Sequence, residues 1–399
     1  MVQDKYLACD PLPDVDNERD LTSFITLWTE GKDKDLKSAI KQCQVAENVI
    51  KSMQDMSGEA LAMYDQSQLN WCRSYTDKLR AIEITKFDQI CSHILDYMEV
   101  YTTLTAEEEA KKKEQSNKRK GDSNKREILE LIENESDLMF GVWANVQGKS
   151  KMGQNIDFGK YSTILPIKQA TMPLILRCLW TSYDYLSPTK IQDDIVVGGV
   201  VNFQMFSYPE SFKKVGTWKM RNVLTVEQRL KNIPFPDPSG TSGVEQPVDM
   251  QFTLPDYIYT SDDVTQVKIA VWDEKEDCWN HALIAGDLQF KKSTRQVKFT
   301  SMKFAPIALL QSRCTDYPYK NWWLRCVKEE VALLDLWTKR LKLVFEIGPL
   351  YLKLIRNDEP ELQHLVDKEF SPGYLLQELS KCGIHLMPRD EDAKLAGIE

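Results

Sequence analysis

The sequence predicts an α+β protein: a coiled-coil-like helical hairpin at the N-terminus, then antiparallel β-sandwich domains and a short C-terminal helix. Before residue 141, apolar residues recur every three or four positions. After residues 141–146 (Gly-Val-Trp-Ala-Asn-Val) they alternate every second position or form short β-branched runs. The first period buries one stripe of a helix and the second buries one face of a strand. The 399 residues suffice for two or three domains with cores of their own.

The N-terminal part is expected to be mainly helical. Residues 1–16 hold two prolines among several aspartates and predict an extended arm, and a helix follows from Asp20 to Gly31. Two longer amphipathic stripes come next, and Gly58 is expected to end the first of them. Their apolar positions are Leu36, Ile40, Cys43, Ala46, Ile50 and Met53, then Cys72, Tyr75, Leu79, Ile82, Phe87, Ile90, Ile94, Met98 and Tyr101. Each stripe is apolar on one side only, which predicts an antiparallel hairpin, with a coiled coil to another chain as the alternative.

A charged low-complexity connector is expected at residues 105–127, inside a helical region that spans 17–140. It opens with three glutamates, and residues 111–126 then contain eight basic and two acidic residues, a local excess of six positive charges. The basic residues are Lys111, Lys112, Lys113, Lys118, Arg119, Lys120, Lys125 and Arg126. A solvated or disordered segment is one interpretation, and a basic tether for an acidic surface is the other. A helix is expected to resume over 127–139.

The remainder predicts two β-rich domains, 141–231 and 250–399, separated by a Pro/Gly-rich linker at 232–249. Strands are expected at 157–164, 174–185, 195–206, 217–223, 267–272, 288–291, 296–304, 341–347 and 350–354. Short alternating strands separated by turns are typical of antiparallel sandwiches. A helix is expected over 370–382, with Ser371 as N-cap and Gly383 as C-cap.

Composition restricts the class of protein. The net charge of -9 argues against a dedicated nucleic-acid binder. The nine cysteines are odd in number and form no C-x-x-C pair, and the first residues contain no apolar signal segment. The longest apolar runs are far shorter than a membrane span. We therefore expect a soluble, intracellular protein with free thiols, and with neither nucleic acid nor membrane as a partner.

No catalytic signature is found. None of the four histidines has a cysteine or carboxylate at zinc-site spacing. Residues 148–150 (Gly-Lys-Ser) lack the first glycine of a phosphate-binding loop, and Trp143 stands in its place. The sequence therefore predicts a protein that is not an enzyme, with no catalytic, cofactor-binding or metal-ligating residue. An active site assembled from distant residues stays open as the alternative.

An aromatic segment at 317–323 (Tyr-Pro-Tyr-Lys-Asn-Trp-Trp) is dense and partly polar. Such clusters can anchor a protein interface, so Tyr317, Tyr319, Trp322 and Trp323 are candidate interface residues. The alternative is a strand entry that closes the end of a sandwich.

Several segments, in this order, resemble one family, the axonemal dynein intermediate chain 7 proteins, also called cancer susceptibility candidate 1. They are 24–30 (Phe-Ile-Thr-Leu-Trp-Thr-Glu), 140–146 (Phe-Gly-Val-Trp-Ala-Asn-Val), 183–187 (Tyr-Asp-Tyr-Leu-Ser) with 198–200 (Gly-Gly-Val), 318–325 (Pro-Tyr-Lys-Asn-Trp-Trp-Leu-Arg) and 383–388 (Gly-Ile-His-Leu-Met-Pro). Thr29 departs from the arginine of the first motif.

The resemblance implies a structural or adaptor protein of the ciliary or flagellar axoneme. Its expected partners are inner-arm dynein subunits, tubulin of the doublet microtubule and other axonemal proteins, and the eight basic residues become candidate microtubule contacts. A cytoplasmic assembly factor for dynein arms is the alternative. A WD-repeat propeller is not expected, because Trp272-Asp273 is a lone pair without a repeat of about 40 residues.

Overall fold

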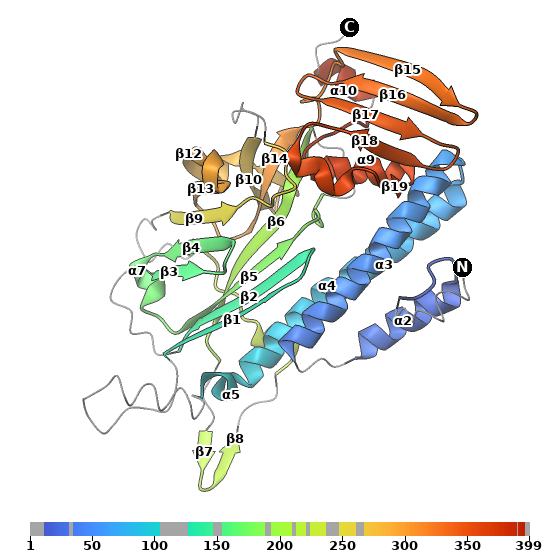
Figure 1. Ribbon diagram of the computed structural model, residues 1–399. Helices are drawn as coiled ribbons and strands as arrows, with labels where there is room; N and C mark the ends of the chain where they lie inside the picture. Colours follow the sequence, from blue (N-terminus) through green and yellow to red (C-terminus); the bar gives the residue numbers. More distant parts are fainter. Residues whose placement is uncertain are drawn as a thin grey trace, which may run out of the picture.

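The computed structural model describes residues 12–31, 35–103, 127–146, 154–187, 193–209, 213–220, 224–236, 247–260, 267–388 and 390–395. A helical hairpin lies along one face of a β sandwich, and a smaller sheet with its own helix packs at one end of both (Figure 1). The α+β class, with helices first and antiparallel sheets after them, is confirmed. None of the described helices combines the length and the apolar character needed to cross a membrane.

The helices are α2 (Glu18–Glu30), α3 (Leu36–Ala62), α4 (Gln66–Asp96) and α5 (Met98–Thr102). Asn17, and not Asp20, caps α2, because its side chain accepts a hydrogen bond from the Arg19 amide. The long helices α3 and α4 run antiparallel, as expected, and bury their apolar stripes between them. The expected break at Gly58 is wrong, since α3 continues to Ala62.

The hairpin is not a free arm. Its apolar core continues into one face of the larger sheet and includes Leu129, Phe140, Val142 and Leu179. Burying a continuous apolar face in this way stabilises both layers, at roughly 25 cal/mol for each Å² removed from water.

The helix expected over 127–139 is wrong. Residues there form β1 (Ile128–Asn134) and the first part of β2 (Leu138–Asn145), which pair antiparallel. Leu129 is fully buried and Leu131 partly buried, while the glutamates between and after them are exposed or half-buried. Burial that alternates from one residue to the next fits a strand whose inner face lies on α3. The strand pattern therefore begins at residue 128 and not at 141.

The sandwich is built from two antiparallel sheets with β1–β2–β5–β6–β14–β10–β11 in one and β12–β13–β9–β4–β3 in the other. The strands not yet bounded are β3 (Gln154–Asp157), β4 (Tyr161–Leu165), β5 (Leu174–Thr181), β6 (Asp194–Ser207), β9 (Val248–Thr253), β10 (Val267–Asp273), β11 (Cys278–Asn280), β12 (Ile284–Lys291), β13 (Gln296–Ser301) and β14 (Pro306–Ser312). Trp143, Leu176, Phe203 and Val297 belong to the core between the two sheets.

One predicted strand and the predicted linker differ from the structure. The single strand expected over 157–164 is interrupted at Gly159, whose φ of 82° turns the chain from β3 into β4. The expected linker at 232–249 does not separate two sheets, because β6 and β14 pair across it, with Val200 opposite Ala308. Antiparallel partners need not be adjacent in sequence, and a linker composition alone cannot exclude pairing across it.

Shorter elements complete the body. They are α7 (Ile167–Ala170), the β7–β8 hairpin (Lys213–Val215 and Trp218–Met220), α8 (Val226–Arg229) and 3-10 turns at His281–Leu283, Lys292–Thr294 and Pro360–Leu365.

A third antiparallel sheet, in the order β15–β16–β17–β18–β19, packs on α9. Its strands are β15 (Asn321–Lys328), β16 (Val331–Trp337), β17 (Lys342–Ile347), β18 (Leu352–Arg356) and β19 (Glu369–Phe370), and the helices are α9 (Pro372–Lys381) and α10 (Asp390–Leu395). The expected C-terminal helix is confirmed: Ser371 accepts from the Tyr374 amide, and Gly383, with a φ of 84°, follows its end.

Candidate protein-interaction sites

The predicted site residues fall into two groups. The eight basic residues of 111–126 lie outside the described residues, so their use as contacts stays a prediction. The four aromatic residues lie within the described part of the chain and form a covered pair of tyrosines and an exposed pair of tryptophans. Tyr317 is buried and Tyr319 half-buried, whereas the exposed fractions of Trp322 and Trp323 are 61% and 44%.

The tyrosine pair lies at the entry to β15. The two rings meet edge to face with their centroids 5.2 Å apart, and the Tyr317 ring also lies 6.4 Å from the His385 ring. Burial raises the pKa of the Tyr317 hydroxyl far above its usual range. Tyr317 thus packs as an interior residue, which agrees with the interpretation of this segment as a strand entry.

The tryptophan pair lies on β15, an edge strand. All eight residues of β15 are exposed, and within the described part of the chain it pairs with β16 alone. Side chains alternate between faces. Trp322 lies opposite Leu336, which belongs to the core over α9, so Trp322 and Leu324 extend the inner face. Their exposed fractions of 61% and 56% show that this row extends beyond the covered core.

On the outer face of β15, Trp323 packs against a neighbouring ring on one side. Its ring lies edge to face on Trp337, with centroids 4.9 Å apart, and the Lys342 ammonium lies 3.9 Å from the Trp337 ring centre. Arg325 forms an ion pair with Asp335 at 3.0 Å, with 62% of its own side chain exposed. These contacts fix the outer face of β15 while leaving its free edge open.

A groove of about 430 Å³ opens at the hairpin end of the same sheet. Cys326, Ala332 and Ile347 are aligned across β15, β16 and β17 by the strand register, and all three line this groove. Gly348 and Pro349 form part of its far wall. The groove is thus a hollow with a mostly apolar lining at the end of β15, and Lys328 and Glu330 are its charged residues.

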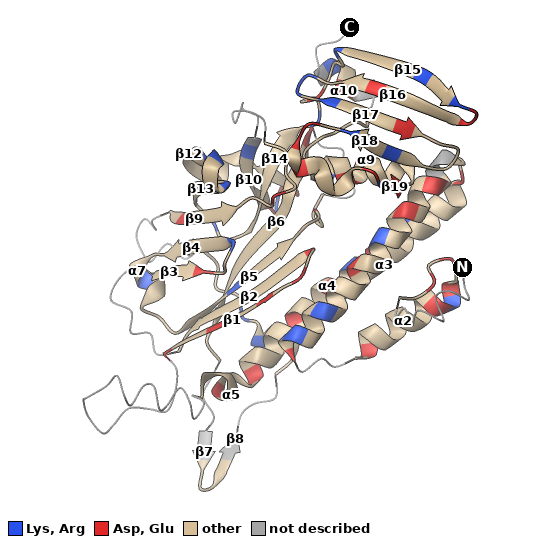
Figure 2. Cartoon of the chain, viewed as in Figure 1, with Lys and Arg blue, Asp and Glu red and all other residues tan. Residues whose placement is uncertain are grey.

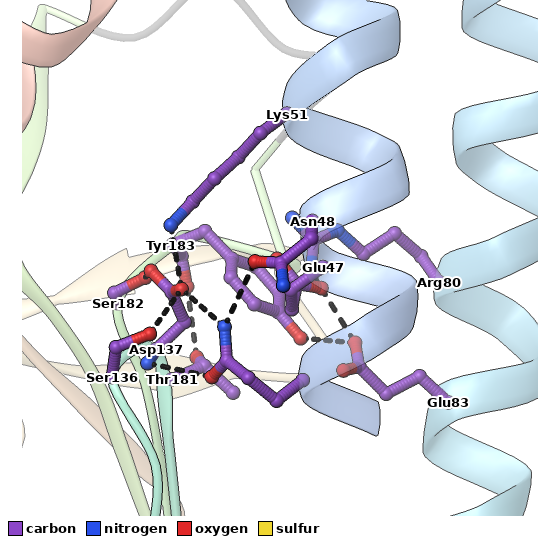
Figure 3. A network of polar contacts seen from close by, with 11 residues as sticks. Glu47, Asn48, Lys51, Arg80, Glu83, Ser136, Asp137, Thr181, Ser182 and Tyr183 are labelled. Carbon is purple, nitrogen blue, oxygen red and sulfur yellow. Dashed lines mark hydrogen bonds and ion pairs between the residues drawn. The ribbon is translucent and has the colours of Figure 1, made fainter. Parts of the chain in front are cut away.

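Sequence reasoning missed a polar network between the hairpin and the sandwich (Figure 3). Asp137, in the turn between β1 and β2, accepts hydrogen bonds from Gln44 at 2.7 Å, Lys51 at 2.6 Å and Ser182 at 2.8 Å. Burial alone would raise the pKa of Asp137, but the Lys51 ammonium and the hydrogen bonds from Gln44 and Ser182 lower it to about 2. This carboxylate therefore joins α3 to two separate parts of the larger sheet.

A second cluster surrounds Glu83 on α4. Arg80 forms ion pairs with Glu47 and with Glu83, and its guanidinium stacks 3.1 Å from the centre of the Tyr183 ring. The Tyr183 hydroxyl donates to Glu83. Burial raises the pKa of Glu83 to about 7, although Arg80 and the Tyr183 hydroxyl oppose the shift. Both contacts are made to Glu83 Oε2, whereas Glu83 Oε1 is buried without a hydrogen-bond partner among the described residues. The cluster joins α4 to Glu47 of α3 and to Tyr183, which follows β5.

The charges on the outward side of the hairpin are mixed, with acidic and basic residues following each other along α3 and α4 (Figure 2). Within the described ranges, no three histidine, cysteine or carboxylate side chains gather as a metal site.

Comparison with known proteins places the chain near one group. Residues 4–121 match the family model described as cancer susceptibility candidate 1 N-terminus. Dynein axonemal intermediate chain 7 of Danio rerio is 23% identical over 52% of this chain and 30% of its own length. The Bos taurus protein of the same name is 18% identical over 96% of this chain and 66% of its own. The chain thus spans less than two thirds of these relatives, and the matches confirm the resemblance to the dynein axonemal intermediate chain 7 family.

Proposed function

We propose that this chain is a non-catalytic structural or adaptor component of the ciliary or flagellar axoneme, associated with inner-arm dynein and with the doublet microtubule. The observation that carries the proposal is the similarity to the Bos taurus dynein axonemal intermediate chain 7 along 96% of the chain. A match of that extent covers the hairpin, the sandwich and the third sheet together.

The architecture supports a holding function. The hairpin is fixed on the sandwich by a shared apolar core and by the Asp137 network, which favours a rigid body over a hinged one. The exposed aromatic residues of β15 offer an apolar contact surface at one end. In this proposal the basic residues of 111–126 contact the acidic surface of the microtubule.

Retention in isolated axonemes tests the proposal. A tagged chain is expressed in ciliated cells, cilia are isolated, and the membrane and soluble matrix are removed with detergent. An axonemal component stays with the microtubules and leaves in the salt extract that releases dynein arms. A chain found only in the cytosol and the detergent extract contradicts the proposal and favours the assembly-factor alternative.

Microtubule co-sedimentation tests the basic segment. Changing all eight basic residues of 111–126 to glutamine is expected to weaken binding at least tenfold at low salt, and added salt should weaken binding of the parent chain because exposed charge pairs are screened.

A control variant loses the same amount of positive charge elsewhere on the surface. Eight exposed basic residues suit this purpose: Lys37, Lys41, Arg73, Lys160, Lys168, Lys291, Lys292 and Lys298. Equal binding by the parent chain and the 111–126 variant at every salt concentration would remove this segment from the proposal.

A further inference from the structure

We propose that the free edge of β15 receives an added strand from a partner protein, and that the added segment is extended, with apolar residues alternating with acidic ones. The inference deepens the proposed function, since it assumes a chain that works by binding its neighbours. It names the mode of binding and the chemistry of the bound segment.

The first argument is the state of the edge. An edge strand presents a row of backbone N–H and C=O groups without strand partners, and proteins usually protect such edges with short strands, charges, proline or bulges. β15 is eight residues long and carries Trp322, Trp323, Leu324 and Val327 with exposed fractions of 44% or more. Its register shift against β16 lies between Cys326 and Lys328, so the pairing from Asn321 to Cys326 is regular. A long apolar edge of this type is suited to strand addition, in which main-chain hydrogen bonds supply affinity.

The second argument is the shape of the inner face. A strand added beside β15 would lie about 4.8 Å from it and place every second side chain on the inner face. Those side chains would cover Trp322 and Leu324, whose row continues the core of Leu336 and Phe345 beyond the reach of α9. One of them would lie beside Cys326, at the mouth of the groove of about 430 Å³. Strand addition would therefore complete a hydrophobic layer that ends abruptly at β15.

The third argument is charge. β15 and the residue before it contain Lys320, Arg325 and Lys328 and no acidic residue, and Figure 2 shows basic but no acidic colour along the strand. The nearby acidic residues are Glu329 and Glu330, in the turn after β15, and Asp335, which pairs with Arg325 from the β16 side and leaves 62% of the Arg325 side chain exposed. Arg325 lies on the outer face, where the alternate side chains of an added strand would stand beside it. Opposite charges on neighbouring strands attract and like charges repel. Acidic residues therefore fit the outer face of the bound segment, and a second copy of β15 would place basic residues beside basic residues.

Selection of peptides tests the proposal. The purified full-length chain is used to select from a displayed library of random nine-residue peptides. The enriched peptides are expected to alternate apolar with acidic residues, and their affinity should fall as salt is added. Enriched peptides without a period of two, or with a helical period of three to four, would overturn the proposal, and so would the absence of any enrichment.

A pair of matched variants locates the binding. Leu324→Lys places a charge on the inner row of β15, and Leu350→Lys makes the same change at an exposed leucine (66%) that precedes β18. The first should weaken peptide binding by about tenfold or more, which corresponds to about 1.4 kcal/mol, and the second should not change it. Circular dichroism of both variants establishes that each is folded. Equal affinities in the two variants would contradict binding at β15.

Cys326 supplies a test of strand geometry. It is exposed, whereas the other described cysteines are buried or half-buried. Neighbouring antiparallel strands bring paired Cα atoms to 4.5–5.5 Å, which suits a disulfide. A selected peptide is prepared with a cysteine, held as a mixed disulfide with thiopyridine, at each position in turn. The Cys326 thiolate should displace the thiopyridine and couple fastest at the one position opposite it, because positions two residues away lie about 7–8 Å from Cys326. Cys326→Ser should abolish coupling, and uniform coupling along the peptide would contradict a paired strand.

The two proposals can fail separately. Peptide selection uses the isolated chain, so its failure leaves axonemal retention untouched. A chain that binds alternating acidic peptides through β15 and is nevertheless absent from extracted axonemes would keep the strand-addition site and remove the axonemal function.

Discussion

At the scale of single residues, the least predictable feature is the set of charged groups beneath the hairpin. Glu83 meets Arg80 within its own helix, but Tyr183 comes from a point 100 residues further along the chain. The apolar spacing of α4 correctly places Leu79 and Phe87 in the core. It gives no signal that Glu83, between them, is also buried with an exposed fraction of 1%. A charged residue on an apolar stripe becomes interpretable only when its partners are known.

Glu83 should make stability fall as pH rises. Its folded pKa of about 7 lies above the usual value of 4.5, so between these two values the folded state binds more protons than the unfolded state. The contribution is therefore most favourable below pH 4.5 and decreases through the folded pKa, by about 3 kcal/mol in all. Glu83→Gln should flatten this part of the profile, as measured by urea unfolding at pH 5, 6, 7 and 8.

The control is Glu59→Gln, at an exposed position on α3, which should leave the profile as it is. Burial lowers the pKa of His385, and that group has the opposite effect on the slope. His385 is present in the parent chain and in both variants, so its effect cancels when the stability of a variant is subtracted from that of the parent. If the Glu83→Gln curve runs parallel to that of the parent chain, Glu83 does not titrate in this range.

At the scale of elements, periodicity and capping predict α3, α4 and α9 well, because each has one apolar side and α9 also has Ser371 at its start. They fail at 127–139, where three pairs of adjacent apolar residues fit a helix and a strand equally. Packing against β2 and α3 decides for the strand. The groove beside β15 could not be predicted from the sequence either, because it depends on how β15, β16 and β17 are aligned with one another.

The glycine in α3 illustrates the same limit. Gly58 predicts a helix end from sequence, yet it is there because the start of α9 packs against α3. A Cβ at Gly58 would lie 2.8 Å from the Ser371 hydroxyl and 3.2 Å from the Gly373 Cα, and a Cβ at Gly373 would lie 2.7 Å from the Gly58 Cα. Glycine at both positions allows the two backbones to approach.

Gly58→Ala should therefore destabilise the protein. Alanine favours a helix by about 1 kcal/mol over glycine, but overpacking against backbone costs about 1–3 kcal/mol, and here the second effect should exceed the first. Chemical denaturation measures the difference, with Ser52→Ala at an exposed site of α3 as the control, expected to be neutral or slightly stabilising. A more stable Gly58→Ala variant would show that α9 can move away at little cost.

At the scale of the whole molecule, the hairpin and the sandwich form one unit because they share a core and the Asp137 network. The sequence indicates two separate classes of structure, helices first and strands after them, and contains no local sign that one lies on the other. Their union depends on contacts such as Gln44 with Asp137, which are 93 residues apart.

Asp137→Asn tests this union. The carboxylate accepts from Gln44, Lys51 and Ser182, and an amide would remove the charge that pairs with Lys51 and turn one acceptor into a donor. Breaking a buried pair costs about 3–5 kcal/mol, and since the Lys51 side chain is 30% exposed we expect about 2 kcal/mol. Hydrogen exchange should accelerate in α3 and α4 more than in β9 and β13, which belong to the other sheet.

The pH dependence separates this effect from a general loss of packing. The pKa of Asp137 is lowered to about 2 in the folded state, so its stabilisation is present above its usual value near 4 and is lost as pH falls toward 2. The difference in stability between the parent chain and Asp137→Asn should therefore shrink as the pH falls from 5 to 2.5, while Asp77→Asn, at an exposed site of α4, should show no such change. A constant difference, or equal acceleration of exchange in both sheets, would mean that Asp137 supports the fold generally and does not join the hairpin to it.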